Sequence, residues 1–226
     1  AEGYLAAAYE YLSYALYPDA GRAPEDENLR RALLVFVTVL GTCIRREAQL
    51  RPYDPLTDVR GVTVEERGES RLGTEYDAFC RAAEDAHYIE LMRLARECMP
   101  FDPLSHTSGV HHVAVHMARQ AQKNGVPVDI ALVSAAALSH DIGKFGCRGE
   151  DTKRIPYLHY YYTNQWLLSH KLPNVAHIAS NHSTWDLEYE NLPVESLLLI
   201  YADFRVRGAR DESGREKVSI HTLAEA

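Results

Sequence analysis

Residues 128–144 read VDIALVSAAALSHDIGK, a nearly continuous apolar stretch that ends in an adjacent histidine–aspartate pair. Ile130, Val133 and Ala137 recur at helical spacing and share one side of the helix with His140. An imidazole or carboxylate directed into a helical core is costly unless it is paired or binds a cation. The stretch therefore predicts a buried helix that ends in a polar pair with a chemical role.

Helical patterns continue on both sides of this stretch. Val110, Val113 and Met117 follow helical spacing after Ser105, and Asn124-Gly125 is expected to end that helix. Three more helices are expected downstream, at residues 158–170, 175–182 and 194–206. Because no alternating strand pattern or internal repeat is found, the sequence predicts an all-α fold.

The first hundred residues also favour helices joined by polar loops. Helices are expected at residues 5–16, 29–51 and 76–98, with a loop at 18–28 and a short hairpin or mobile loop at 59–72. We expect a helical N-terminal region (residues 1–100), a domain that carries the chemistry (101–210) and a C-terminal tail (211–226). The tail ends in VSIHTLAEA, which has a helical pattern, and the chain is expected to be a segment of a longer protein or to have a processed end.

Composition excludes several classes of protein. The 226 residues are 46% hydrophobic and 25% charged, which argues against a collagen-like, disordered or disulfide-scaffold chain. A net charge of -8 argues against a binder of bulk nucleic acid or of anionic membranes. The most apolar run, residues 32–44, is too short for a membrane span of about 20 residues. Four dispersed cysteines without a CxxC pair favour a reduced, cytoplasmic location.

Histidine is the unusual residue of this chain. All but two of the 11 histidines lie between His106 and His182. The candidate metal ligands can each be placed on the apolar face or at the end of an expected helix; they are His106, His140, Asp141, His159, His182 and Asp203. Imidazole and carboxylate groups suit one or two divalent transition ions such as Fe, Mn, Co, Ni or Zn.

Not every histidine is expected to be a ligand. His106 lies one turn before Val110 on the apolar face, whereas His111 and His112 fall away from it, so helical phase favours His106. His111, His112 and His116 are therefore expected at the surface. A single core histidine is more often a hydrogen-bonded packing residue than a ligand, so the assignment of His159 and His182 depends on the ordered set.

The order H…HD…H…H…D resembles the HD superfamily of metal-dependent phosphohydrolases. The similarity covers about residues 100–210 and is carried by HTSGVHHVA at His106, SHDIGK at His140-Asp141, LHYYYTNQWLL at His159, IASNHSTWDLE at His182 and IYADFRVR at Asp203. The resemblance implies an HD-domain helical bundle with additional N-terminal helices. It also implies a core metal site of His106, His140, Asp141 and Asp203.

The extra histidines point to one branch of that family. His159 and His182 match the additional ligands of the dinuclear branch, in which the aspartate of the HD pair bridges two metals. Asn181-His182 stands where the cyclic dinucleotide phosphodiesterases have a His-His pair, and their GYP signature is absent, so that branch is disfavoured. The stretch from HST to YAD is more similar to small bacterial HD hydrolases that split dinucleoside polyphosphates.

The implied reaction is hydrolysis of a phosphate ester or anhydride of a nucleotide-like small molecule. A divalent cation lowers the pKa of its bound water to about 7, and Asp141 and Lys144 are the expected catalytic residues. Charge on the phosphoryl group must be balanced by cations. The candidates for substrate binding are Lys144, Arg148, Lys153, Arg154 and Arg205, with Tyr160 among tyrosines that stack a base or pack the core. Arg148, Lys153 and Arg154 are equally consistent with a solvated loop.

Two other functions stay open on the sequence alone. A mixed-valent di-iron oxygenase of the inositol oxygenase type uses the same ligand order. A sensor module could instead retain the site for ligand binding without catalysis. We expect a phosphorylated small molecule as the partner and leave a homo-oligomer open.

Overall fold

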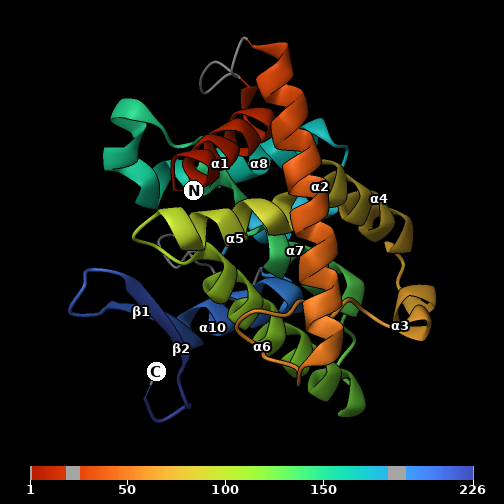
Figure 1. Cartoon of the computed structure of the whole chain (residues 1–226). Coiled ribbons are helices and arrows are strands. Elements are labelled where there is room, and N and C mark those ends of the chain that lie inside the picture. Colours follow the sequence, from red (N-terminus) through yellow and green to blue (C-terminus); the bar gives the residue numbers. More distant parts are fainter. Residues whose placement is uncertain (1, 19–25, 183–191, 226) are drawn as a thin grey trace.

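The computed structural model describes residues 2–18, 26–182 and 192–225, and it shows helices packed around one core (Figure 1). The all-α prediction is confirmed. The helices are α1 (Glu2–Leu16), α2 (Glu27–Leu50), α3 (Val64–Glu69), α4 (Gly73–Asp85), α5 (Tyr88–Cys98), α6 (Pro103–Lys123), α7 (Ile130–Ser139), α8 (Ile155–Ser169), α9 (Pro173–Ala179) and α10 (Val194–Arg205), with 3₁₀ helices η2 (Ile142–Gly146) and η3 (Gly149–Arg154).

Helix α7 is the centre of the bundle, and every one of its residues is buried. It contacts α6, α9 and α10 on several sides, and its alanines allow these neighbours to approach closely. Asp129 caps its N-terminus by accepting the Leu132 backbone N–H at 3.0 Å. The helix therefore has a fixed start and a buried end, and His140 and Asp141 follow at that end.

Helix α6 is covered on more than one face. It contacts α5, α7 and α10, and its buried residues include polar Ser105, Thr107 and Ser108 as well as Val110. Asp102 caps it by accepting the Ser105 N–H at 2.9 Å, and Pro103 occupies the first turn, where it costs no hydrogen bond. This start makes His106 the fourth residue of α6, at the end of the first turn.

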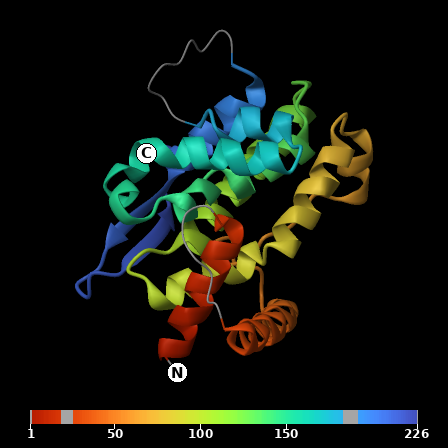
Figure 2. The same cartoon turned by 90° about the horizontal axis from the view of Figure 1, so that it is seen from above.

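The N-terminal helices pack directly on this bundle. Helix α5 contacts both α1 and α6, while α2 runs along the outside and contacts α1 and α5 (Figures 1 and 2). The boundary expected near residue 100 falls between α5 and α6. Residues of α1 and α5 therefore lie close enough to contribute to a site built on α6.

Three expectations about secondary structure are wrong. The segment 59–72 contains α3, which a capping box starts: Thr63 Oγ1 accepts the Glu66 N–H, and the Glu66 carboxylate accepts the Thr63 N–H. The single helix expected over residues 76–98 is two helices, because the chain turns at His87, which has a left-handed φ of 50°. The C-terminal segment contains strands instead of the expected helical continuation.

Those strands form a two-stranded antiparallel hairpin. Strand β1 (Val206–Arg210) pairs with β2 (Glu216–Ile220), with Val206 opposite Ile220. The Glu216 N–H donates to the Pro100 carbonyl at 2.9 Å, which joins the hairpin to the chain between α5 and α6. The hairpin therefore lies against the start of α6.

Part of what the sequence predicts lies outside the described residues. The loop at 18–28 is described only at its ends, and residues 183–191 separate His182 from the segment that leads to α10. The similarity carried by the stretch from HST to YAD falls partly on that gap. Among the described residues, no helix combines the length and hydropathy that a membrane span requires.

Candidate metal centre

Five helices bring the six candidate ligands to one place. His106 lies on α6, His140 caps the C-terminus of α7 and Asp141 follows it directly. His159 lies on α8, His182 lies beyond the end of α9, and Asp203 lies near the end of α10. Except for His106 and Asp203, which are partly exposed, these residues are buried.

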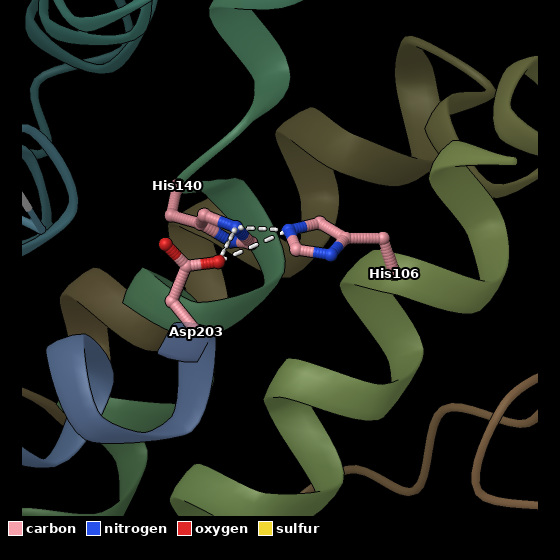
Figure 3. A group of neighbouring side chains, drawn as sticks. All are labelled: His106, His140 and Asp203. Atoms are coloured by element: carbon pink, nitrogen blue, oxygen red, sulfur yellow. Dashed lines mark hydrogen bonds and ion pairs between the residues drawn. The ribbon is translucent and has the colours of Figure 1, made fainter. Parts of the chain in front are cut away.

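The first group of ligand atoms joins α6, α7 and α10 (Figure 3). His106 Nε2 lies 3.1 Å from Asp203 Oδ1 and 3.3 Å from His140 Nε2. His140 Nε2 lies 3.8 Å from Asp203 Oδ1. Nitrogen and oxygen atoms of this kind and spacing could hold a divalent cation.

The second group consists of His159 and His182, whose Nε2 atoms lie 3.2 Å apart. His159 Nδ1 donates to the Ile155 carbonyl at 2.7 Å, and His182 Nδ1 donates to the Ala179 carbonyl at 2.5 Å. Because a carbonyl can only accept, these bonds place the ring protons on Nδ1. Both Nε2 lone pairs therefore point at each other, an arrangement that suits a shared cation.

Asp141 stands between the two groups. Its Oδ2 lies 3.3 Å from His106 Nε2 and 3.4 Å from His140 Nε2. Its Oδ1 lies 3.7 Å from His159 Nε2 and 4.0 Å from His182 Nε2. One carboxylate oxygen thus faces each group of histidines.

The imidazoles behind this carboxylate are neutral. Burial lowers the pKa of His140 and His159, and it lowers the pKa of His182 to about 3. His140 Nδ1 also donates to a backbone carbonyl, that of Ala137, at 2.8 Å. A metal ion binds the neutral imidazole through its free nitrogen, so these rings are ready to bind without losing a proton.

His106 differs from the other rings because it carries a charge. Burial acts to lower its pKa, but hydrogen bonds to Asp141 and Asp203 outweigh burial and raise the pKa to about 9. Burial acts to raise the pKa of Asp203. The hydrogen bond from His106, together with the other nearby histidines, outweighs burial and lowers that pKa to about 2. Protonated His106 thus balances carboxylate charge that a metal ion would otherwise neutralise.

Lys144 supplies the second positive charge of the centre. Its Nζ donates to Asp141 Oδ2 at 2.5 Å, and the side chain keeps 43% of its surface exposed. Burial acts to lower the pKa of Lys144, but the charge of Asp141 outweighs it and raises that pKa. The pKa of Asp141 is held well below its usual range: burial alone would raise it, but the charge of Lys144 and the hydrogen bond from protonated His106 outweigh burial. Lys144 therefore sits at the open side of the centre as an ammonium ion.

Gly143 explains why the HDIGK turn can pack so tightly on α8. A Cβ at this position would collide with the His159 carbonyl and the Thr163 backbone nitrogen. Thr163 Oγ1 accepts the Gly143 N–H at 3.0 Å and donates to the His140 carbonyl at 3.0 Å. The turn thereby sets the spacing between Asp141 and His159.

The other candidate cations have partners outside the six ligands or are exposed. Arg148 stacks on the Tyr14 ring at 4.0 Å, and the exposed Lys153 pairs with Glu150 at 2.7 Å. Arg154 is exposed at the start of α8. Arg205 donates to the His221 carbonyl and to the Tyr201 hydroxyl. Of the candidate cations named from the sequence, only Lys144 contacts one of the six ligands in the described part of the chain.

Tyr160 does lie at the centre. Its ring centroid is 3.8 Å from that of His159 and 4.6 Å from that of His182. The ring therefore packs on the second histidine pair.

The surface position expected for His111 is wrong. His111 is buried, and its Nε2 lies 2.9 Å from the Ser134 hydroxyl on α7. Burial lowers its pKa to about 3, so the ring is a neutral packing residue. His112 is half-buried and bonded to the Tyr53 hydroxyl, and His116 is exposed as expected. Helical phase misplaces His111 because α6 is covered on more than one face.

A cavity of about 370 Å³ opens beside His106, Asp141 and Lys144. Tyr88 of α5 and Thr107 of α6 line it, and sequence reasoning missed both. Thr107 follows His106 directly and could have been noticed on that ground. Tyr88 carries no local signal, because only the packing of α5 on α6 brings it to the site.

Comparison with protein families agrees with this geometry, since residues 104–205 match the model of the HD domain. The chain contains an HD domain. The match begins at the second residue of α6 and ends with α10, so it contains all six candidate ligands. Comparisons with curated proteins and with solved structures gave no match. A match to the HD domain suggests a metal-dependent hydrolase family, and the buried histidines and aspartates of the matched segment could hold a metal ion.

Proposed function

We propose that this chain is a metal-dependent phosphohydrolase that binds two divalent cations. His106, His140 and Asp203 would hold one cation, and His159 and His182 the other. Asp141 would be shared by both, and its position carries the proposal: Oδ2 faces the first group at 3.3 and 3.4 Å, and Oδ1 faces the second at 3.7 and 4.0 Å.

The donor atoms fit such cations. They are imidazole nitrogens and carboxylate oxygens without thiolate, a set that suits Mn, Fe, Co, Ni or Zn. The lone pairs of His159 and His182 face each other without a proton between them, which is unfavourable unless a cation lies there. When bound, divalent cations supply the Lewis acidity that activates water and balances phosphoryl charge.

The chain's own residues then bind and orient the substrate. Lys144 Nζ already contacts Asp141 and is partly exposed, so it can turn toward a phosphoryl oxygen as a fixed cation. Tyr160 is placed to pack on a bound molecule beside the second histidine pair. We propose a phosphate ester or anhydride of a nucleotide-like small molecule as substrate. Arg148, Lys153, Arg154 and Arg205 are not needed at the phosphate in this proposal.

Release of inorganic phosphate tests the proposal. The purified chain, stripped of metal and then loaded with Mn²⁺, Co²⁺ or Fe²⁺, is incubated with a panel of nucleoside phosphates in air and under argon. We expect phosphate release that needs metal and is equal in both atmospheres. Dioxygen uptake with a polyol or phosphonate and no phosphate release would instead show an oxygenase. Binding of nucleotides without turnover would show a sensor.

A further inference from the structure

The cavity beside the metal centre is built by more than the HD domain. Tyr9 of α1, Tyr88 of α5 and Glu216 of β2 line it together with His106, Asp141 and Lys144. These three added residues lie outside residues 104–205. In Figure 1, α5 lies between α1 and the hairpin, and residues of all three elements line the cavity.

One wall of the cavity is aromatic. Phe145 lies in η2 directly after HDIGK, and its ring centroid is 6.5 Å from that of Tyr9 and 6.1 Å from that of Tyr88. The contact with Tyr88 is edge-to-face, with an interplanar angle of 86°. Ile155 adds an aliphatic side chain. Such a wall favours an apolar or aromatic group over a charged one.

Two buried hydroxyls in the same cavity form no well-formed hydrogen bond with the residues that the structure describes, although they lie close enough to each other for Thr107 to lower the pKa of Tyr88. They are Tyr88 Oη and Thr107 Oγ1, on side chains that are 1% and 0% exposed. Buried polar groups in proteins are nearly always hydrogen-bonded, so two hydroxyls without a well-formed bond in one cavity are available to a bound molecule. Both hydroxyls lie at the end of the cavity near the candidate metal ligands. Thr107 directly follows His106. The charge of Asp141 is the second largest cause, after burial, that raises the pKa of Tyr88.

The charge of the cavity limits what binds there. The cations among the described lining residues are Lys144 and protonated His106, which already pairs with Asp141 and Asp203, whereas Asp102, Asp141 and Glu216 are acidic. Glu216 accepts the Asp102 N–H at 2.7 Å and is close enough to Lys144 to help raise its pKa. A second phosphoryl group beyond Lys144 would meet these carboxylates, and like charges repel strongly in a partly buried site.

We infer that this cavity binds a phosphomonoester with one phosphoryl group and an apolar or aromatic organic group. This inference rests on the proposed function. Tyr88 and Thr107 donate neutral hydrogen bonds to phosphoryl oxygens beside Lys144. The organic group packs against the wall of Tyr9 and Phe145. The residues added by α1, α5 and β2 thus determine which substrate the HD domain accepts.

Binding of two phosphonates, which do not hydrolyse, tests the inference. Benzylphosphonate and methylphosphonate are titrated calorimetrically into the Mn²⁺-loaded full chain, with metal content measured on the same sample. We expect benzylphosphonate to bind at least about tenfold more tightly, because its ring buries apolar surface. In competition at saturating Mn²⁺, adenosine monophosphate should displace benzylphosphonate at a lower concentration than adenosine triphosphate. Equal affinity of the two phosphonates, or no binding of either, would overturn the inference, as would stronger competition by the triphosphate.

Tyr88→Phe isolates the phenol hydroxyl without changing the shape of the core. It should lower the affinity for both phosphonates about fivefold to tenfold, because one hydrogen bond is lost, without lowering the melting temperature. Thr107→Val should act in the same way. Tyr9→Ala should lower the affinity for benzylphosphonate and leave that for methylphosphonate unchanged. Unchanged affinity in both Tyr88→Phe and Thr107→Val would refute the role of the hydroxyls.

Tyr17→Phe is the matched control. Tyr17 is buried outside this cavity, and its hydroxyl donates to the Tyr162 carbonyl at 3.0 Å. Loss of the Tyr17 hydroxyl should lower the melting temperature and leave phosphonate affinity unchanged, which is the reverse of the result expected for Tyr88→Phe. Selective phosphonate binding without phosphate release would keep the cavity assignment and reject the hydrolase. Phosphate release without selective phosphonate binding would support the hydrolase and reject the cavity assignment.

Discussion

His159 and His182 direct their Nε2 atoms at each other across 3.2 Å, and each ring is held by a bond from Nδ1 to a backbone carbonyl. Burial lowers the pKa of both rings, so neither offers the other a proton. Two facing lone pairs repel unless a cation lies between or beside them. The same buried corner contains one oxygen of Asp141, and this relationship underlies the second cation of the proposed centre.

Asp141→Asn should abolish metal loading and reduce phosphate release at least about a hundredfold, because the amide keeps the shape but loses the shared negative charge. Far-ultraviolet circular dichroism should show an unchanged helical fold. Asp85→Asn, at the exposed end of α4, is the control and should retain full activity. Normal metal content in Asp141→Asn would remove Asp141 from the centre.

Lys144→Ala should lower kcat/KM for phosphate release by about tenfold to a hundredfold through the loss of a fixed cation at the phosphoryl group. Metal affinity should not fall, because Lys144 competes with metal for Asp141 Oδ2. Lys123→Ala, at the far end of α6 from His106, serves as the control. Steady-state kinetics and metal analysis of the same preparations check this, and unchanged kinetics would mean that Lys144 is structural.

His106 makes the stability of the metal-free chain depend on pH. The pKa of His106 is about 9 in the folded chain, and its ordinary value is about 6.5. Its bonds to Asp141 and Asp203 therefore stabilise the folded chain fully below pH 6.5. That stability is lost as the pH rises through 9. In EDTA, calorimetry should show a melting temperature that falls by a few degrees between pH 6.5 and 9.5. His106→Asn should flatten this decline, and an equal decline in the variant would assign it to other groups.

His111→Ala should lower the free energy of unfolding by about 2–3 kcal/mol, since it leaves a cavity and removes the Ser134 partner. Metal content should stay normal. His116→Ala, at an exposed position of the same helix, should change stability by less than about 0.5 kcal/mol. Denaturant titration measures both variants. Loss of metal in His111→Ala would make this residue a ligand.

The helical fold follows from local patterns, and the exceptions have local causes. The apolar spacing of residues 76–98 continues through Ala86 and His87 without glycine or proline, so nothing in it marks the turn where His87 becomes left-handed. The start of α3 can be predicted from the sequence, because Thr63 and Glu66 have the spacing of a capping box. The hairpin strands are short and partly exposed, which leaves a weak alternating pattern.

The six candidate ligands could be named from order and spacing, because each lies on or just after a helix with a clear apolar face. The cavity could not be predicted. Tyr88 and Glu216 reach the cavity beside His106 only through the packing of α5 and β2 on α6, and no short-range pattern predicts that packing. Burial of His111 likewise depends on how many helices surround α6.

Metal stoichiometry tests the two-cation centre most directly. The chain is saturated with Mn²⁺, dialysed, and analysed for metal and protein by elemental analysis, beside a His159→Ala/His182→Ala double variant. We predict two ions per chain in the wild type and one in the double variant. One ion in both, or none in the wild type, would contradict the shared centre.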